Sequence, residues 1–209
     1  MSYIENIFIC LAAPLLLAIP CLRREGRGSL IFVVAGMTSC LFSAYVSTFL
    51  AGVMGADLIT ASNEISPAVE EIMKLLPILY FLLVFEPDRK IVINGALMVA
   101  VGFATFENVC FLTSYGTSEL LRVLIRGFGT GAMHVVCGLV VAVSLFHLWD
   151  KEWLRIMGGF ALLCFVITFH GLFNIFMNQS GAIFWIGSVI PMTVVLSYWF
   201  ILRKIIGIS

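Results

Sequence analysis

Long apolar runs separated by short polar breaks extend along the whole chain. Each run is about 20 residues long, and a helix of that length crosses roughly 30 Å of hydrocarbon. The runs are continuously apolar and lack the alternation of barrel strands, so they predict helices. The pattern predicts about seven of them: Ile4–Cys21, Ser29–Met54, Pro67–Phe85, Ile91–Leu112, Leu120–Trp149, Ile156–Met177 and Ala182–Leu202. The expected fold class is all-α, a polytopic transmembrane helix bundle.

The composition agrees with this pattern. Hydrophobic residues make up 61% of the chain and charged residues 11%, and the mean hydropathy is +1.09, values outside the range of soluble globular domains. We expect one integral membrane domain over residues 1–209, in a lipid bilayer, with the chemistry in a core at about 67–177. The formal net charge of zero gives no indication of nucleic-acid binding. The six cysteines lack paired spacing and are interpreted as buried apolar residues.

The basic residues between the expected helices fall on one side of the membrane. They follow the first, third, fifth and seventh helices: Arg23, Arg24, Arg27, Arg89, Lys90, Lys151, Arg155, Arg203 and Lys204. The loops on the opposite side, at 57–64, 114–119 and 178–181, contain neither Lys nor Arg. The positive-inside rule therefore predicts an N-terminus outside and a C-terminus in the cytoplasm.

Several ionisable or amide side chains interrupt the apolar runs. They are Glu70, Glu71, Lys74, Glu107, His134, His170 and Asn174. Charged groups are costly in hydrocarbon and usually face a protein interior or a water-filled cavity. A functional site is therefore the first interpretation, and an ion-pair lock between helices is the structural alternative.

Positions along the helices predict that these side chains meet. At about 1.5 Å per residue, their depths below the outer ends of their helices can be compared. The depth is about 5 Å for the two adjacent glutamates, about 8 Å for Glu107, and about 10 Å for Lys74 and His170. His134 is expected deeper, at about 20 Å, unless a kink near Gly129 raises it. Glycines in the helices, Gly95, Gly102, Gly127, Gly129, Gly131 and Gly138, would allow close helix contact around the site.

Four short motifs occur in order on four successive helices. Glu70-Glu71-Ile-Met-Lys74 matches EExxK, Phe103-Ala-Thr-Phe-Glu107-Asn108 matches FxxxE followed by Asn, Arg126 precedes His134 by eight residues, and His170-Gly-Leu-Phe-Asn174 matches HxxxN. In this order the chain resembles the PrsW-type intramembrane proteases, distant relatives of CAAX prenyl proteases and bacteriocin-processing membrane enzymes. The resemblance covers about Pro67 to Asn174.

This resemblance implies a membrane-embedded, metal-dependent peptidase of the bacterial cytoplasmic membrane. The best-known members of the family cut anti-sigma factors near the outer membrane face, so the implied substrate is a single-pass membrane protein. Zinc is the expected cofactor, although a water activated by glutamate alone would use the same residues.

The expected catalytic residues divide into three roles. Glu70 or Glu71 is the general base, since desolvation strengthens a carboxylate as a base while Lys74 keeps it ionised. Glu107 and His134 are expected to bind water or metal, supported by the neighbouring Asn108. The predicted metal ligands are Glu71, Glu107, His134 and His170.

His170 and Asn174 either complete the zinc site or stabilise the tetrahedral oxyanion. Asparagine is a poor zinc ligand, which favours the oxyanion role for Asn174. Arg126 either holds the substrate backbone or Glu107, or extends toward the headgroups.

The resulting hypothesis is an intramembrane endopeptidase that hydrolyses a peptide bond of a membrane protein near the outer membrane face. The rival interpretation is an ion- or proton-coupled channel or transporter, which also places charges inside the membrane. We see no inverted repeat that would favour it. A third interpretation is a catalytically silent relative that binds membrane proteins.

Overall fold

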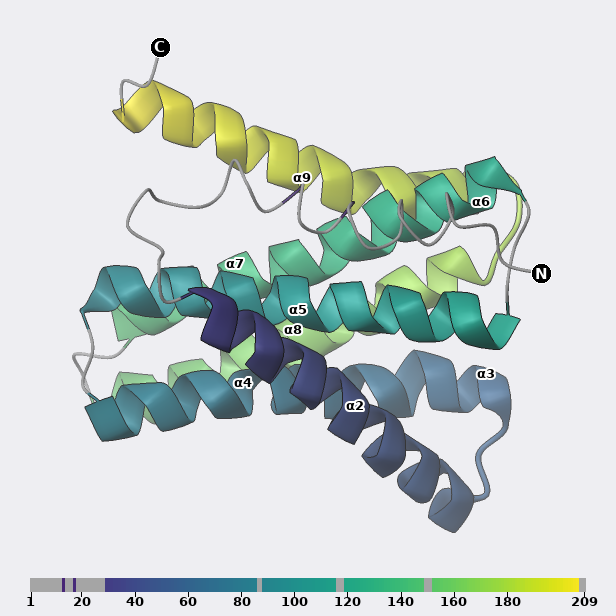
Figure 1. Cartoon of the computed structure of the whole chain (residues 1–209), viewed down its shortest axis with the longest axis horizontal. Helices are drawn as coiled ribbons and strands as arrows, with labels where there is room; N and C mark the ends of the chain where they lie inside the picture. The colour runs from purple at the N-terminus through teal and green to yellow at the C-terminus, as the bar shows by residue number, and fades with distance from the viewer. Residues whose placement is uncertain are drawn as a thin grey trace.

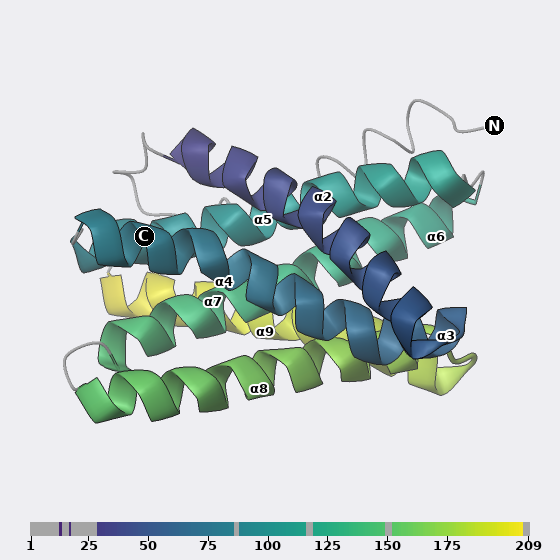
Figure 2. The ribbon, with the colours of Figure 1, turned by 90° about the horizontal axis from the view of Figure 1, so that it is seen from below.

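A computed structural model describes residues 13, 17, 29–85, 88–115, 119–148 and 152–206, and this part of the chain is a bundle of helices (Figures 1 and 2). Its elements are α2 (Ser29–Met54), α3 (Leu58–Thr60), η2 (Ala61–Ile65), α4 (Ser66–Phe85), α5 (Arg89–Tyr115), α6 (Leu120–Leu124), η3 (Ile125–Thr130), α7 (Gly131–Leu148), α8 (Glu152–Met177) and α9 (Ala182–Ile206). The all-α prediction is confirmed. The predicted helix Ile4–Cys21 lies outside the described residues, apart from two of its positions.

The chain is a multi-pass membrane protein. Within the described residues, five helices are long and apolar enough to cross a membrane: Ile31–Met54, Ile91–Ser114, Ile125–Leu145, Glu152–Met177 and Ala182–Phe200. α4 also has the length of a membrane-spanning helix, but it contains Glu70, Glu71 and Lys74 and is not one of the five. A total of seven spanning helices and the orientation of the termini remain predictions.

One predicted loop is wrong. Residues 57–64 were expected to connect two helices, but the chain becomes helical again at Leu58 and stays helical through η2 into α4. Asp57 caps this start, because its Oδ1 accepts a hydrogen bond of 2.7 Å from the backbone N–H of Thr60. The same bond holds the pKa of the exposed Asp57 carboxyl below its usual value. The polar residues that follow resemble a loop in composition, yet the N-cap makes them the first turns of a helix.

α5 and α7 form the centre of the bundle. In their most apolar stretches 72% of residues are buried, against 33% in α2 and 22% in α8 and α9. The outer helices instead expose large apolar side chains such as Tyr45, Phe160 and Phe200. Such surfaces suit lipid, so the polar groups of α5 and α7 lie where the bundle itself surrounds them.

Glycines bring α2 and α5 into backbone contact where α2 crosses obliquely (Figure 1). A Cβ on Gly36 would lie 2.1 Å from the carbonyl oxygen of Val99, and one on Gly102 would lie 2.1 Å from that of Val33. A Cβ on Gly95 would lie 2.9 Å from a phenylalanine ring of α2. The prediction that Gly95 and Gly102 permit close helix contact is confirmed. This packing fixes α5, which carries Glu107.

Candidate active site

Side chains from five elements meet in one cluster inside the bundle. They are Glu70, Glu71 and Lys74 of α4, Glu107 of α5, Arg126 of η3, His134 of α7 and His170 of α8. Hydrogen bonds and ion pairs connect them from Arg126 at one end to His170 at the other, and Glu70 lies next to His170 at 3.7 Å. The predicted convergence of these residues is therefore found.

Lys74 lies at the middle of the cluster and connects two of its helices. Its Nζ is 2.6 Å from Glu71 Oε1 and 2.9 Å from His134 Nδ1. The ammonium also lies 5.0 Å from the centre of the Phe103 ring, a cation–π distance. Lys74 and Glu71 are both buried, so each charge depends on the other for compensation. The two residues are three positions apart on α4, a spacing at which side chains of a helix are neighbours.

His134 is held in one protonation form by its two neighbours. Lysine only donates hydrogen bonds, so His134 Nδ1 accepts from Lys74 Nζ. Its Nε2 therefore carries the proton and donates it to Glu107 Oε2 over 2.5 Å. Arg126 Nη2 donates to the other oxygen of Glu107, also over 2.5 Å. His134 is thus a neutral imidazole with both nitrogens occupied.

His170 leaves one nitrogen available. Its Nδ1 lies 2.7 Å from Glu71 Oε1, which accepts this proton as it does that of Lys74. The lone pair then resides on Nε2, which faces Glu70 Oε2 at 3.7 Å. That oxygen of Glu70 is buried and has no hydrogen-bond partner. Two acceptors without donors face each other, an arrangement that a bound cation would satisfy.

The residues present fit a divalent metal ion. Glu70, His134 and His170 each offer a ligand atom, and these atoms lie within 4.8 Å of one another. The 3.7 Å between Glu70 Oε2 and His170 Nε2 is close to the separation of about 3.4 Å between two ligands of a tetrahedral zinc with bonds of about 2.0–2.1 Å. His134 would have to exchange one of its two present hydrogen bonds to take part.

The two remaining carboxylates lie behind the histidines. Glu71 bonds to His170 and Glu107 bonds to His134, as outer carboxylates do in metal sites where they orient the imidazole ligands. From the sequence, Glu71 and Glu107 were predicted as ligands and Glu70 was not. The geometry favours Glu70 for a direct ligand and assigns the orienting positions to the other two.

Asn174 makes a hydrogen bond outside this cluster. Its Nδ2 donates to the backbone oxygen of Ser62 in η2, at 2.8 Å. One turn earlier, a Cβ on Gly171 would lie only 2.9 Å from the backbone oxygen of Asn63. The HxxxN motif therefore also holds η2 against α8, and the oxyanion role of Asn174 stays a prediction. Asn108 is fully buried beside Glu107 on α5.

The helix of His134 differs from the expected geometry. A depth of about 20 Å assumed a regular α-helix from Leu120, but the π-helix η3 precedes α7 and contains Gly127 and Gly129. π-helical turns often occur at functional sites. His134 lies at hydrogen-bond distance from Lys74 and Glu107, and its depth in the membrane and the kink at the glycines stay predictions.

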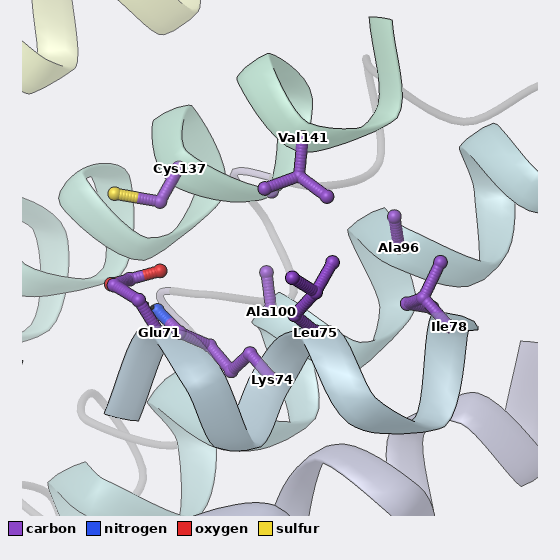
Figure 3. Close-up of a pocket in the computed structure, with 9 residues that line it drawn as sticks. Glu71, Lys74, Leu75, Ile78, Ala96, Ala100, Cys137 and Val141 are labelled. Carbon is purple, nitrogen blue, oxygen red and sulfur yellow. Dashed lines mark hydrogen bonds and ion pairs between the residues drawn. The ribbon is translucent and has the colours of Figure 1, made fainter. Parts of the chain in front are cut away.

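Three features of the site were missed from the sequence. Phe103 was quoted only as a motif residue, yet its ring lies under the Lys74 ammonium. Ser62, whose backbone oxygen binds Asn174, was placed in a loop. Asp57 is a helix N-cap signal that could have predicted the helical segment containing Ser62. Cys137 was interpreted as apolar filler, and it lines a cavity together with Glu71 (Figure 3); no sequence signal pointed to it.

Comparison with known protein families gives one informative result. The model of the family described as PrsW family intramembrane metalloprotease matches residues 26–202, which is most of the chain. Curated proteins and solved structures gave no match. The match contains all the residues of the cluster.

Proposed function

The chain belongs to the PrsW family of intramembrane metalloproteases, and on this premise we propose that it is an endopeptidase that hydrolyses a peptide bond of a single-pass membrane protein near the outer membrane face. The observation that supports this most directly is the pair of acceptors formed by Glu70 Oε2 and His170 Nε2, 3.7 Å apart inside the bundle. Channel or transporter activity is not favoured by the family.

Glu70, His134 and His170 would hold the metal, and we propose zinc. A ligand set of two imidazoles and one carboxylate with an open position is that of several catalytic zinc sites. When bound, the metal supplies Lewis-acid activation of a water and of the substrate carbonyl.

The carboxylates of the cluster have separate tasks in this proposal. Glu71 orients His170 through Nδ1, and Glu107 orients His134 through Nε2. Glu70 has one buried oxygen that faces His170, and its side chain is 14% exposed, so its second oxygen accepts the proton of the attacking water. Of the two adjacent glutamates between which the sequence leaves the base open, we propose Glu70, which would bind the metal through Oε2 and act as the base through its other oxygen.

Arg126 is the residue that we assign to the substrate backbone. Its Nη2 bonds to Glu107, while its Nε is buried without a hydrogen-bond partner. An unused guanidinium donor next to the cluster can bind a peptide carbonyl or the oxyanion that develops from it. Asn174 was the sequence candidate for this role, but its amide already donates to Ser62.

Substrate and location are further parts of the proposal. Charged and polar groups gather near the ends of the helices that the positive-inside rule assigns to the outer side, which supports cleavage near that face. We propose the bacterial cytoplasmic membrane as the location and an anti-sigma factor as the first class of substrate to test.

The test is cleavage in reconstituted membranes by wild-type protein and Glu70→Gln. A library of tagged single-pass segments serves as substrate, and metal content is measured by mass spectrometry before and after chelation. We expect the wild type to contain about one zinc and to lose cleavage with the metal. Glu70→Gln removes the base together with one metal ligand, so it should lower the zinc content and reduce cleavage by at least about 10²- to 10⁴-fold, the usual contribution of a general base alone.

The matched control is Glu64→Gln, the same substitution at an exposed position of η2, which should cleave at the wild-type rate. Cleavage retained in Glu70→Gln would contradict the role of Glu70. A wild type that cleaves no member of the library would contradict the endopeptidase proposal. Full cleavage after removal of the metal would contradict only the metal dependence and leave the endopeptidase proposal standing.

A further inference from the structure

The two histidines of the cluster are each bonded to a carboxylate through one ring nitrogen. His170 donates from Nδ1 to Glu71 Oε1 over 2.7 Å, and His134 donates from Nε2 to Glu107 Oε2 over 2.5 Å. In metal sites, a histidine ligand usually donates one ring N–H to a carboxylate or carbonyl and binds the metal through its other nitrogen. This pattern assigns Nε2 of His170 and Nδ1 of His134 to the metal.

These two nitrogens differ in what they face. Nε2 of His170 faces Glu70 Oε2 at 3.7 Å, whereas Nδ1 of His134 accepts a hydrogen bond of 2.9 Å from Lys74 Nζ. The two imidazole rings lie side by side, with their centres 5.1 Å apart. The single lone pair of His134 Nδ1 serves one partner at a time, and in this structure that partner is the ammonium of Lys74.

Lys74 is held at this nitrogen by Glu71. The Lys74 side chain extends toward the Glu71 carboxylate (Figure 3), and its Nζ lies 2.6 Å from Glu71 Oε1. Both side chains are buried, so the ammonium cannot leave its carboxylate without a large cost in free energy. A metal ion that binds Nδ1 of His134 must therefore displace the ammonium from this nitrogen while the Glu71–Lys74 pair persists.

We propose that Lys74 and the metal ion compete for Nδ1 of His134, so that Lys74 sets how tightly the site binds metal. The inference rests on the metal site of the proposed protease function and adds a residue that controls it. In the exchange, Lys74 Nζ keeps its three protons and its bond to Glu71, and His134 keeps its proton on Nε2. No proton leaves the cluster. The hydrogen bond that is lost lowers the metal affinity relative to a site in which Nδ1 is free.

The first experiment identifies the nitrogen of His134 that binds zinc. Nitrogen NMR spectra of protein with isotopically labelled histidine are recorded in mixed micelles before and after addition of zinc ions. His147→Gln removes the third histidine of the chain, and the other two are distinguished by the nitrogen that carries the proton, Nε2 in His134 and Nδ1 in His170.

We expect zinc to move the Nδ1 resonance of His134 to the position of a metal-bound nitrogen, with the proton retained on Nε2. Zinc at Nε2 of His134 would overturn the competition, because Lys74 would then keep its bond. No change at either nitrogen of His134 would overturn it as well. Both results leave zinc binding at Glu70 and His170 intact, so they are distinct from a failure of the metal site.

The second experiment measures zinc affinity by competition with a chromophoric chelator. Lys74→Met removes the competing ammonium, and the matched control Arg126→Gln removes a positive charge from the same cluster but leaves Lys74 on His134. Each variant leaves one carboxylate without its basic partner, so a general effect of charge appears in both. We expect Lys74→Met to bind zinc about 10- to 100-fold more tightly than Arg126→Gln, the equivalent of one hydrogen bond to a charged group.

Equal zinc affinities of the two variants would overturn the competition and leave the metal site standing. If Lys74→Met does not fold, the spectra of the protein with native Lys74 still decide between the two nitrogens of His134. No zinc binding by the wild type in either experiment would contradict the metal site of the proposed function, and the competition with it. Neither readout depends on cleavage, so neither requires a known substrate.

Discussion

The cluster contains two ion pairs in different surroundings, and His134 connects them. On one side, the Glu71 and Lys74 side chains are 2% and 8% exposed. On the other side, the Glu107 and Arg126 side chains are 24% and 23% exposed. Both pairs contact the imidazole of His134. They therefore differ in solvent exposure and not in their bonding to this residue.

This difference in exposure suggests a structural role for the Glu71–Lys74 pair and a role in substrate binding for the Glu107–Arg126 pair. A fully buried pair cannot lose one partner without leaving an uncompensated charge, so Lys74 and Glu71 hold α4, α7 and α8 together through the two histidines. The more exposed pair can exchange a bond with an incoming peptide at lower cost. We therefore expect Arg126 to contact the backbone of a substrate whose scissile bond lies at the Glu70–His170 pair, while the buried Glu71–Lys74 pair fixes the geometry of both histidines.

The largest expected effect on stability comes from breaking the buried Glu71–Lys74 pair. Lys74→Met leaves Glu71 buried without its cation, and the free energy of unfolding should fall by about 3–5 kcal/mol. Denaturation of the purified protein in mixed micelles measures this. The double variant Glu71→Gln/Lys74→Met removes both charges and should recover a large part of the loss. Equal stability of Lys74→Met and wild type would mean that the two pairs do not differ in their structural role.

Breaking the partly exposed Glu107–Arg126 pair should lower stability less than Lys74→Met does and should lower the rate of cleavage directly. Arg126→Gln should cost about 1.5–3 kcal/mol of stability, the usual contribution of a hydrogen bond to a charged group, and less than Lys74→Met, because the pair is only partly buried and Glu107 keeps its bond to His134. Loss of a donor to the developing oxyanion should lower kcat by about 10²- to 10³-fold. Unfolding and single-turnover cleavage are measured on the same preparation. A variant that loses stability as Lys74→Met does, or retains full kcat, would remove the distinction between the pairs.

The smallest effect is expected at the contact between η2 and α8. Asn174→Ala removes the bond to the Ser62 carbonyl and should lower stability by about 1 kcal/mol. Amide hydrogen exchange at 61–65 should become faster, with kcat lowered less than tenfold. If Asn174 instead stabilises the oxyanion as the sequence suggested, kcat falls by about 10²- to 10³-fold while exchange in η2 stays unchanged.

Much of the fold was predictable because hydrophobic length dictates membrane helices. α2 begins and ends at the predicted residues, and α4 begins one residue early. The error at 57–64 has a local cause, since a side-chain cap overrides polar composition there. The π-helix before His134 could not be derived, because the residues of this segment carry no sequence signal that separates π-helical from α-helical turns; in the structure its Gly129 lies near Ser188 of α9.

The residues of the site were predictable, but their pairings were not. Charges within apolar segments must find partners, and this alone brought Glu71, Lys74, Glu107 and the histidines into one group. Which carboxylate faces which nitrogen depends on side-chain directions that sequence spacing does not contain. Glu70 and Glu71 are neighbours on α4, yet Glu71 accepts hydrogen bonds from Lys74 and His170 while Glu70 has a buried oxygen without a donor.

The filled nitrogens of His134 limit what the cluster can conduct. A wire for protons needs, at every link, a group that can take up a proton on one side and release one on the other. The Nδ1 of His134 is covered by the Lys74 ammonium, which can only give. A proton that moves along the cluster from Glu107 therefore stops at this imidazole, whereas in the opposite direction Nδ1 can take a proton from Lys74 while Nε2 releases one to Glu107. As long as Lys74 stays in place, the cluster can pass a proton in one direction at most.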